Sequence, residues 1–363
     1  NWLNIETLTI PGTVKTIGNC VFDGCSKLTS LVYEPSLTGE SLTHGYNDDS
    51  YDEGPFIDSP LTSVNLNREI VYTYPESSLN EANEGLFGGK GNLTSITIGD
   101  QVKTLPGYML ANSGITSIDL NDVSTIGNGA LMGTKCTSIE LPSSVTSIGD
   151  YAFADSQIQT IDLNQVKTIG NGALRGAKFS SITIPGTVTK IGDDVFNGCT
   201  SLSSVTFEGS TAQLTVGFNT DGTDEGLFVD APLTTVNLNR DINYTFPTNS
   251  LDTPIEGLFG NKSSLVNITL GDNVKTVSGY MFANAGITSI NLNKVTSIGK
   301  GAFEGVSNIT ELEIPASVTS IGDFAFKNCT SLANLTFATG SSDLTIGFQP
   351  GTAQYGPFYQ SPL

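Results

Sequence analysis

The chain has 363 residues, with 36 acidic and 16 basic side chains, so its formal net charge is −20 although only 14% of its residues are charged. A surface this anionic repels phosphate backbones and anionic lipid, which argues against nucleic-acid binding and against binding to a membrane surface. An apolar content of 38% excludes wholesale disorder, and a single histidine leaves little material for metal sites or general-base catalysis.

The two ends of the chain carry no targeting or anchoring signal. The N-terminal segment NWLNIETLTIPG lacks a basic region followed by an apolar run, and no stretch reaches the roughly 18 to 20 apolar residues that span a bilayer. The last residues, QSPL, stop in the middle of the repeating pattern described below. We therefore expect this chain to be a fragment of a longer protein, with signal and anchor segments elsewhere and no membrane insertion of its own.

From residue 5 onwards the sequence repeats a unit of the form L-x-x-I-x-I-P-x-x-V-x-x-I-G-x-x-A-F-x-x-C. The first, fourth and sixth positions are apolar in every copy, which a chain with 38% apolar residues does not produce by chance. We place fourteen unit starts, the last unit being truncated, at Ile5, Leu28, Leu61, Leu93, Ile115, Cys136, Ile158, Phe179, Leu202, Leu233, Leu265, Ile287, Ile309 and Leu332. Self-similarity at a fixed period is the signature of repeat architectures.

The pattern predicts a fold in which no unit is stable alone. The fourth and sixth positions alternate with polar residues, as in a half-buried strand, and V-x-x-I-G-x-x-A-F supplies a second apolar wall. Burying the apolar side chains of one unit contributes on the order of 10 kcal/mol, whereas ordering its backbone costs about 1–2 kcal/mol per residue. Neighbouring units must therefore share their apolar walls. We predict a repeat solenoid, mainly β with short turns and little helix, wound as a right-handed superhelix of about fourteen units.

A longer period overlies the short one. Longer units occupy residues 28–92, 202–264 and 332–363. The first two segments match in detail, since REIVYTYP at Arg68 corresponds to RDINYTFP at Arg240. All three segments carry a phenylalanine at the same place: Phe56, Phe228 and Phe358. A larger cassette is therefore itself repeated, and we predict a single solenoid domain over residues 1–363.

The joint signature L-x-x-I-x-[IL]-P with V-x-x-I-G-x-x-A-F resembles the BspA-like leucine-rich repeats of bacterial surface proteins, over essentially the whole chain. The resemblance implies a leucine-rich-repeat superhelix and an exported or surface-attached module, because some members of that family are implicated in adhesion to host proteins or other cells. It implies no catalytic residues. The chain departs from the general leucine-rich repeat after the strand, where asparagine (as at Asn67 and Asn121) alternates with proline (as at Pro11 and Pro142).

The polar positions beside the fourth position of each unit should line an open face of the sheet. They are Ser, Thr or Asn almost throughout, and none is basic. Five are acidic: Asp119, Glu140, Asp162, Glu311 and Glu313. The first three fall in successive units, so we expect their side chains to stack about 5 Å apart. This strip is open to two interpretations, a site for a basic partner or cation and a plain solvated face, and stacked carboxylates leave glycoside hydrolysis as a third.

Aromatic residues alternate in the insertions of the first two long segments. Tyr72 and Tyr74 in one segment match Tyr244 and Phe246 in the other, and the alternation predicts an extra strand or hairpin. Aromatic side chains and solenoid insertions both contribute to binding surfaces, which makes these four residues partner-binding candidates beside the five carboxylates. The alternative is that they pack against the neighbouring long unit.

The remaining chemistry-bearing residues favour structural roles, and we expect no metal and no cofactor. His44 falls where the matching segments have Val216 and Ile346, which indicates a partly apolar loop face. Four cysteines occupy apolar columns and indicate small buried residues: Cys25, Cys136, Cys199 and Cys329. The acidic loops at residues 47–53 and 219–225 match no calcium-binding spacing.

These observations predict a non-catalytic binding or adhesion module of an exported or cell-surface bacterial protein. We expect its partner to be a host or neighbouring-cell protein or a glycan, met through the strand face and the long-unit insertions. We further expect a monomer that binds no nucleic acid. Two alternatives stay open: a carbohydrate-active enzyme that uses the stacked carboxylates, and a passive spacer that holds another domain away from the cell.

Overall fold

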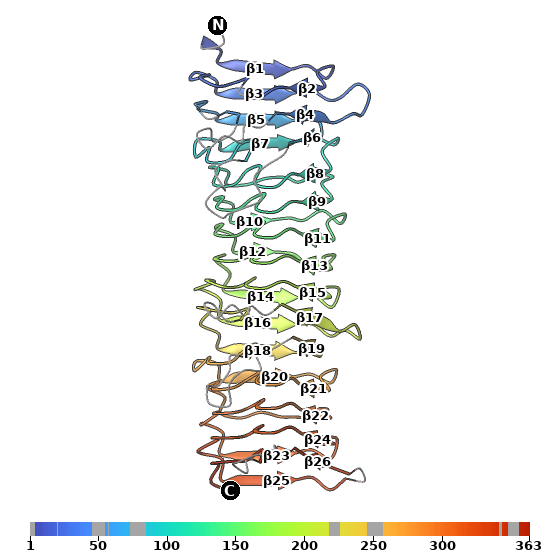
Figure 1. The fold of residues 1–363 in the computed structure, drawn as a ribbon, viewed down its shortest axis with the longest axis vertical. Helices are drawn as coiled ribbons and strands as arrows, with labels where there is room; N and C mark the ends of the chain where they lie inside the picture. The colour runs from blue at the N-terminus through green and yellow to red at the C-terminus, as the bar shows by residue number, and fades with distance from the viewer. Residues whose placement is uncertain are drawn as a thin grey trace. The chain divides into compact units, whose positions relative to one another are not determined.

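The computed structural model describes residues 4–19, 21–45, 55–56, 58–72, 85–217, 226–244, 257–340, 343–347 and 356–363. They belong to two compact units, Asn1–Lys178 and Phe179–Leu363, which are taken one at a time below. The described residues form 26 short strands and no α-helix, and their strand pairs are parallel (Figure 1). The mainly β repeat solenoid is therefore confirmed, whereas the single domain over residues 1–363 stays a prediction.

In the first unit the coils contribute strands to two ladders, which stand as two columns of arrows in Figure 1. The first ladder consists of β1 (Thr7–Ile10), β3 (Ser30–Tyr33), β5 (Ser63–Leu66) and β7 (Ser95–Ile98), with the pair β10 (Ser138–Ile139) and β12 (Thr160–Ile161) further along the chain. The second ladder consists of β2 (Thr16–Ile17), β4 (Leu42–His44) and β6 (Ile70–Val71), then of β8 (Thr104–Leu105), β9 (Thr125–Ile126), β11 (Ser147–Ile148) and β13 (Thr168–Ile169).

The second unit repeats this plan. Its first ladder consists of β14 (Ser181–Ile184), β16 (Ser204–Phe207), β18 (Thr235–Leu238) and β20 (Asn267–Leu270), with the pair β23 (Glu311–Ile314) and β25 (Asn334–Phe337) further along. Its second ladder consists of β15 (Lys190–Ile191), β17 (Leu214–Val216) and β19 (Ile242–Asn243), then of β21 (Thr276–Val277), β22 (Ser297–Ile298), β24 (Ser320–Ile321) and β26 (Thr345–Ile346).

The apolar columns of the repeat supply the core. In β14, Ile182 and Ile184 are buried while the residues between and before them are exposed, which is the predicted two-residue period. The parallel register carries the columns from coil to coil, since Ile184 pairs with Phe207 of β16. Phe337 is an exception and is 47% exposed, because β25 is the last strand of its ladder and pairs only with β23.

The turn that comes after the second-ladder strand of each coil builds a third inter-coil ladder. Backbone N–H groups of one coil donate to carbonyls of the next, as from Phe282 to Ala302 (2.9 Å) and from Phe303 to Ala325 (2.8 Å). A phenylalanine from each turn stacks on the next, with ring centroids 5.3 to 5.6 Å apart in the second unit. This phenylalanine column comprises Phe196, Phe228, Phe259, Phe282, Phe303, Phe326 and Phe358.

Each pair of long coils buries an arginine. Arg68 and Arg240 are 1% and 0% exposed, and burial lowers the pKa of both guanidinium groups. Arg240 donates from Nη1 to the carbonyl of Pro185 (3.2 Å) and from Nη2 to that of Ala212 (3.0 Å), while Arg68 donates from Nη1 to that of Pro11 (3.3 Å). The acceptors of Arg240 lie in the two preceding coils, so one side chain fastens three coils together.

Candidate functional site

The first ladder of each unit exposes one face, which is the candidate binding surface predicted from the sequence. In β7 the exposed residues are Ser95 and Thr97, and in β14 they are Ser181 and Thr183. The backbone groups of these strands bond to neighbouring strands. A partner on this face therefore meets hydroxyl, amide and carboxylate side chains.

The five predicted carboxylates are all exposed. In the first unit, β10 and β12 pair Ile139 with Ile161, so the residues that follow them, Glu140 and Asp162, lie beside one another on successive coils. Asp162 also has a local task, because its Oδ1 accepts the backbone N–H of Asn164 at 2.9 Å.

Asp119 performs the same local task two repeats earlier, where its Oδ1 accepts the backbone N–H of Asn121 at 2.9 Å. Both aspartates lie in the tripeptide Asp-Leu-Asn, and aspartate often bonds to its own backbone two residues on. The alternation of polar and apolar residues predicts only that these two residues belong to a charged strip. The tripeptide Asp-Leu-Asn was the available signal that the aspartate side chains form a turn with the backbone two residues on.

In the second unit the structure brings Glu311 and Glu313 together on β23. Their side chains lie on the exposed face and line a hollow of about 380 Å³ that also includes Ser289, Asn334 and Thr336. The hollow lies over three consecutive coils, two of which pair as β23 and β25. It combines two carboxylates with two hydroxyls and an amide, and no basic side chain lines it.

A second hollow, of about 560 Å³, lies at the carboxyl ends of β16, β18 and β20, and we call it the β16–β20 hollow. Its polar lining comes from Thr206, Glu208, Asn237, Asn239 and Thr269, and two glycines complete it. Sequence reasoning missed it, because its residues lie at the ends of three strands, or directly after them, about 30 positions apart in the chain. The available signal in the sequence was Gly209, the glycine that comes shortly after strand β16.

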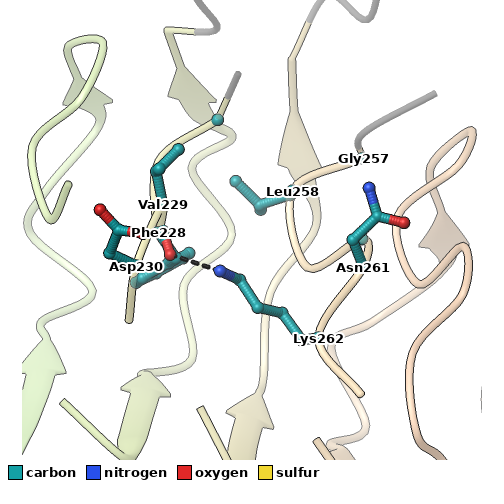
Figure 2. A pocket seen from close by; sticks show the side chains of 9 residues that line it. Phe228, Val229, Asp230, Gly257, Leu258, Asn261 and Lys262 are labelled. Carbon is teal, nitrogen blue, oxygen red and sulfur yellow. Dashed lines mark hydrogen bonds between the residues drawn. The ribbon is translucent and has the colours of Figure 1, made fainter. Parts of the chain in front are cut away.

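A third, smaller pocket in the second unit has a volume of about 110 Å³. Figure 2 shows the side chains that line it. Lys262 reaches across it and donates from Nζ to the carbonyl of Phe228 at 2.6 Å (Figure 2). The matching place in the first unit is lined by Asp58 and Lys90, as this one is by Asp230 and Lys262. The lysine–carbonyl bond indicates that the side chain fastens two long coils together.

The described tyrosines of the insertions are buried. Tyr72 and Tyr244 are 8% and 7% exposed, and burial raises the pKa of Tyr244. Their hydroxyls donate to the carbonyls of Gly107 and Gly279, each at 2.6 Å. Both side chains belong to the packing between coils, but their acceptors lie in the short coil that follows and not in the neighbouring long unit. Burial leaves little of either ring for a partner, and a role in binding stays a prediction. The other two members of this set lie outside the described residues: Tyr74 and Phe246.

His44 packs into the first unit as an apolar residue. It is 2% exposed, its ring centroid lies 6.0 Å from that of Phe22 and 5.7 Å from that of Phe56, and its Nδ1 is 2.9 Å from the carbonyl oxygen of Gly45. Burial lowers its pKa from the ordinary 6.5, against a smaller opposing effect of the bond to Gly45. No described residue bonds its Nε2.

The burial of His44 predicts an acid-sensitive first unit. Below about pH 6.5 the imidazole of the unfolded chain takes up a proton, while that of the folded chain stays neutral. The free energy of unfolding therefore decreases as the pH is lowered, by up to about 1.4 kcal/mol per pH unit from this group. We expect His44→Val, the residue found at Val216, to abolish the part of this loss that lies between about pH 6.5 and the lowered pKa. Urea unfolding at a series of pH values measures it, and equal slopes for both proteins would contradict the assignment.

The four described cysteines are free and buried, which confirms their predicted role. Burial raises the pKa of the Cys329 thiol to about 12, and it also raises the pKa values of Cys25 and Cys136. Within the described parts of the chain, no group of three or more His, Cys, Asp or Glu residues is placed to hold a metal ion. The acidic loops at residues 47–53 and 219–225 lie outside the described residues. No helix in the described ranges has the length and apolar content needed to cross a membrane.

Comparison with known proteins agrees with this geometry. The family described as "BspA type Leucine rich repeat region (6 copies)" matches residues 1–44, 49–135, 124–244 and 242–346. A leucine-rich repeat protein from Bacteroides ovatus is 21% identical with a TM-score of 0.50, over 94% of this chain and 82% of that one, which shows the shared fold. A leucine rich cell surface protein from Faecalibacterium prausnitzii is 20% identical with a TM-score of 0.37, over 93% of this chain and 89% of that one. No curated protein matches the chain.

Proposed function

Because this chain belongs to the BspA type leucine-rich repeat family, we propose that it is a non-catalytic binding module displayed at a cell surface. Proteins of this kind are general interaction scaffolds, in which stacked coils present an extended surface to a partner. The partner is a host or neighbouring-cell protein or a glycan, and it meets the exposed face of the first ladder.

The observation that carries this proposal is the hollow around Glu311 and Glu313. Strand β23 beneath it buries Leu312 and Ile314 in the core, while Glu311 and Glu313 on its other face have no packing task. The two carboxylates and the polar groups of Asn334 and Thr336 meet there without a basic side chain in the lining. Such a surface recognises its partner through charge and hydrogen bonding, which supply specificity and association rate.

The test is a binding screen of the chain against host matrix proteins and glycan panels, followed by Glu311→Gln with Glu313→Gln. We expect the double variant to weaken binding by about tenfold for a basic partner, mainly through slower association at low salt. Surface plasmon resonance at two ionic strengths measures both effects.

The matched control is Asp100→Asn with Asp343→Asn, which removes the same charge from two exposed carboxylates outside the hollow. Retained affinity in this control and loss in the first variant support the proposal. If every partner found binds the Glu311 and Glu313 variant as tightly as the parent chain, this face is not the binding surface.

A further inference from the structure

The β16–β20 hollow contains polar side chains whose hydrogen-bonding capacity the fold does not use. Asn237 donates from Nδ2 to the hydroxyl of Thr206 at 3.2 Å, and its Oδ1 has no partner among the described residues. Asn239 accepts the backbone N–H of Asn273 at 3.3 Å, while its Nδ2 has no described partner. The carboxylate of Glu208 forms neither a hydrogen bond nor an ion pair with any described residue.

The lining selects against most classes of ligand. No basic side chain lines the hollow, which disfavours phosphate, sulfate and acidic sugars. The backbones of β16 and β18 are paired on both sides, so neither strand has a free edge to which a peptide could add as a further strand. The groups that can bond to a ligand are an amide acceptor, an amide donor, a carboxylate and hydroxyls, all within one hollow of about 560 Å³.

This set of groups is complementary to neighbouring hydroxyl groups on a ring. Each hydroxyl both donates and accepts, so it can donate to Glu208 or to the Oδ1 of Asn237 and accept from the Nδ2 of Asn239. Phe207 and Leu238 lie beneath the hollow as fully buried core residues, so the surface that a ligand meets is formed by the polar side chains and the glycines. A volume of this size lies within the roughly 300–1,000 Å³ that is usual for small-ligand sites.

Gly209 keeps the hollow open. A Cβ atom there would lie 2.8 Å from the Nδ2 atoms of both Asn239 and Asn273, closer than Cβ atoms approach such groups. The first unit has Pro35 at the matching position and Val32 where this hollow has Thr206. The open, hydroxyl-bearing form is therefore a property of the second unit, although the cassettes otherwise match.

We propose that the β16–β20 hollow binds one or two residues of a neutral glycan, and this inference rests on the binding function proposed above. Glu208 and the two asparagines bond to ring hydroxyls, and Thr269 borders the sugar from the next coil. An acidic sugar is excluded by repulsion from Glu208 and by the acidic surface.

The test titrates the chain with maltose, cellobiose, lactose and N,N′-diacetylchitobiose, with a digalacturonate as the acidic comparison, by calorimetry and saturation-transfer NMR. We expect at least one neutral disaccharide to bind with a Kd of about 1 mM or lower, and the digalacturonate at least about tenfold more weakly. Gly209→Ala and Thr269→Val should each weaken binding by about tenfold. Thr97→Val, the matching exposed position of the first unit, should leave it unchanged.

Thr269 is exposed, so its substitution keeps the test valid if Gly209→Ala impairs folding. Sugar binding that survives both hollow variants would overturn the inference, as would stronger binding of the digalacturonate. If a protein partner is found but none of the four disaccharides binds, the glycan inference fails while the binding function stands. If no partner of any kind is found, both fail.

Discussion

Replacing Phe282 with alanine is expected to lower the free energy of unfolding of the second unit by about 3–5 kcal/mol. The side chain is fully buried, and its ring stacks on Phe259 and Phe303, each 5.6 Å away between centroids. Removing it leaves a cavity in the middle of the phenylalanine column and deletes two aromatic contacts, each contributing about 0.5–1.5 kcal/mol. Because every coil completes its neighbours, the loss should extend to the coils on both sides.

The first unit supplies the control for this prediction. Its segment Tyr-Met-Leu-Ala-Asn at residues 108–112 matches Tyr-Met-Phe-Ala-Asn at residues 280–284, so Leu110 occupies the place of Phe282 and is buried as completely. Phe282→Leu should therefore cost only about 1–2 kcal/mol. Urea unfolding and amide exchange of residues 265–331 measure both variants. An equal cost for the two substitutions would show that the column does not depend on filled volume.

The buried apolar columns could be predicted because buried positions recur at the same place in every unit, and the sequence has apolar residues at those positions. Cys136 illustrates this, since it was placed in the core only because thirteen other units have Ile, Leu or Phe there, and it is fully buried. The same reasoning aligns His44 with Val216 and predicts a partly apolar loop face, whereas the structure places His44 in β4 and buries it. Comparing the repeats within one chain thus predicts whether an unusual residue is buried.

Strand lengths were less predictable, because local hydrogen bonds compete with the ladder. Every unit was expected to contribute a strand at its fourth to sixth positions, yet the coils around Asp119 and Asn291 contribute none to the first ladder among the described residues. In both coils this side chain accepts the backbone N–H two residues on, at Asn121 and Asn293. The same turn at Asp162 leaves only the two-residue strand β12, so it shortens or replaces strand pairing, which a count of apolar positions does not reveal.

The candidate site could be predicted only in part. The exposed face and its carboxylates follow from alternation, and Glu311 and Glu313 do line a hollow. The burial of Tyr72 and Tyr244 could not be derived, because each hydroxyl bonds to a glycine carbonyl 35 residues further along. Sequence alternation says which side of a strand a residue occupies, but it does not say whether another coil covers that side.

Replacing Gly172 with alanine should lower the free energy of unfolding of the first unit by about 2–5 kcal/mol, for two separable reasons. The first is backbone strain, because the φ of Gly172 is +56° and a residue with a Cβ loses about 1–2 kcal/mol there. The second is a clash, because the new Cβ would lie 2.3 Å from Cε1 of Tyr151, whose ring covers this glycine from the preceding coil. Moving a packed ring costs about 1–3 kcal/mol.

Two glycines of the same unit separate these causes. Gly39 has a φ of +75°, and no atom lies within 4 Å of the place that a Cβ would take, so Gly39→Ala should show the strain alone. Gly91 has neither a positive φ nor a neighbour within 4 Å of that place, so Gly91→Ala should be neutral or stabilise by about 0.4–1 kcal/mol. Urea unfolding of the three alanine variants side by side measures the two contributions.

A double-mutant cycle tests the contact with Tyr151 directly. Tyr151→Gly places at that position the residue that the neighbouring coils already have at Gly129 and Gly172, so the backbone, whose φ there is +54°, keeps its conformation. In that background Gly172→Ala should cost only the strain, which gives a coupling of about 1–3 kcal/mol with Tyr151. A coupling near zero would mean that the ring moves aside freely. The occurrence of tyrosine and glycine in turn at this position of successive coils would then reflect backbone conformation alone and not packing between coils.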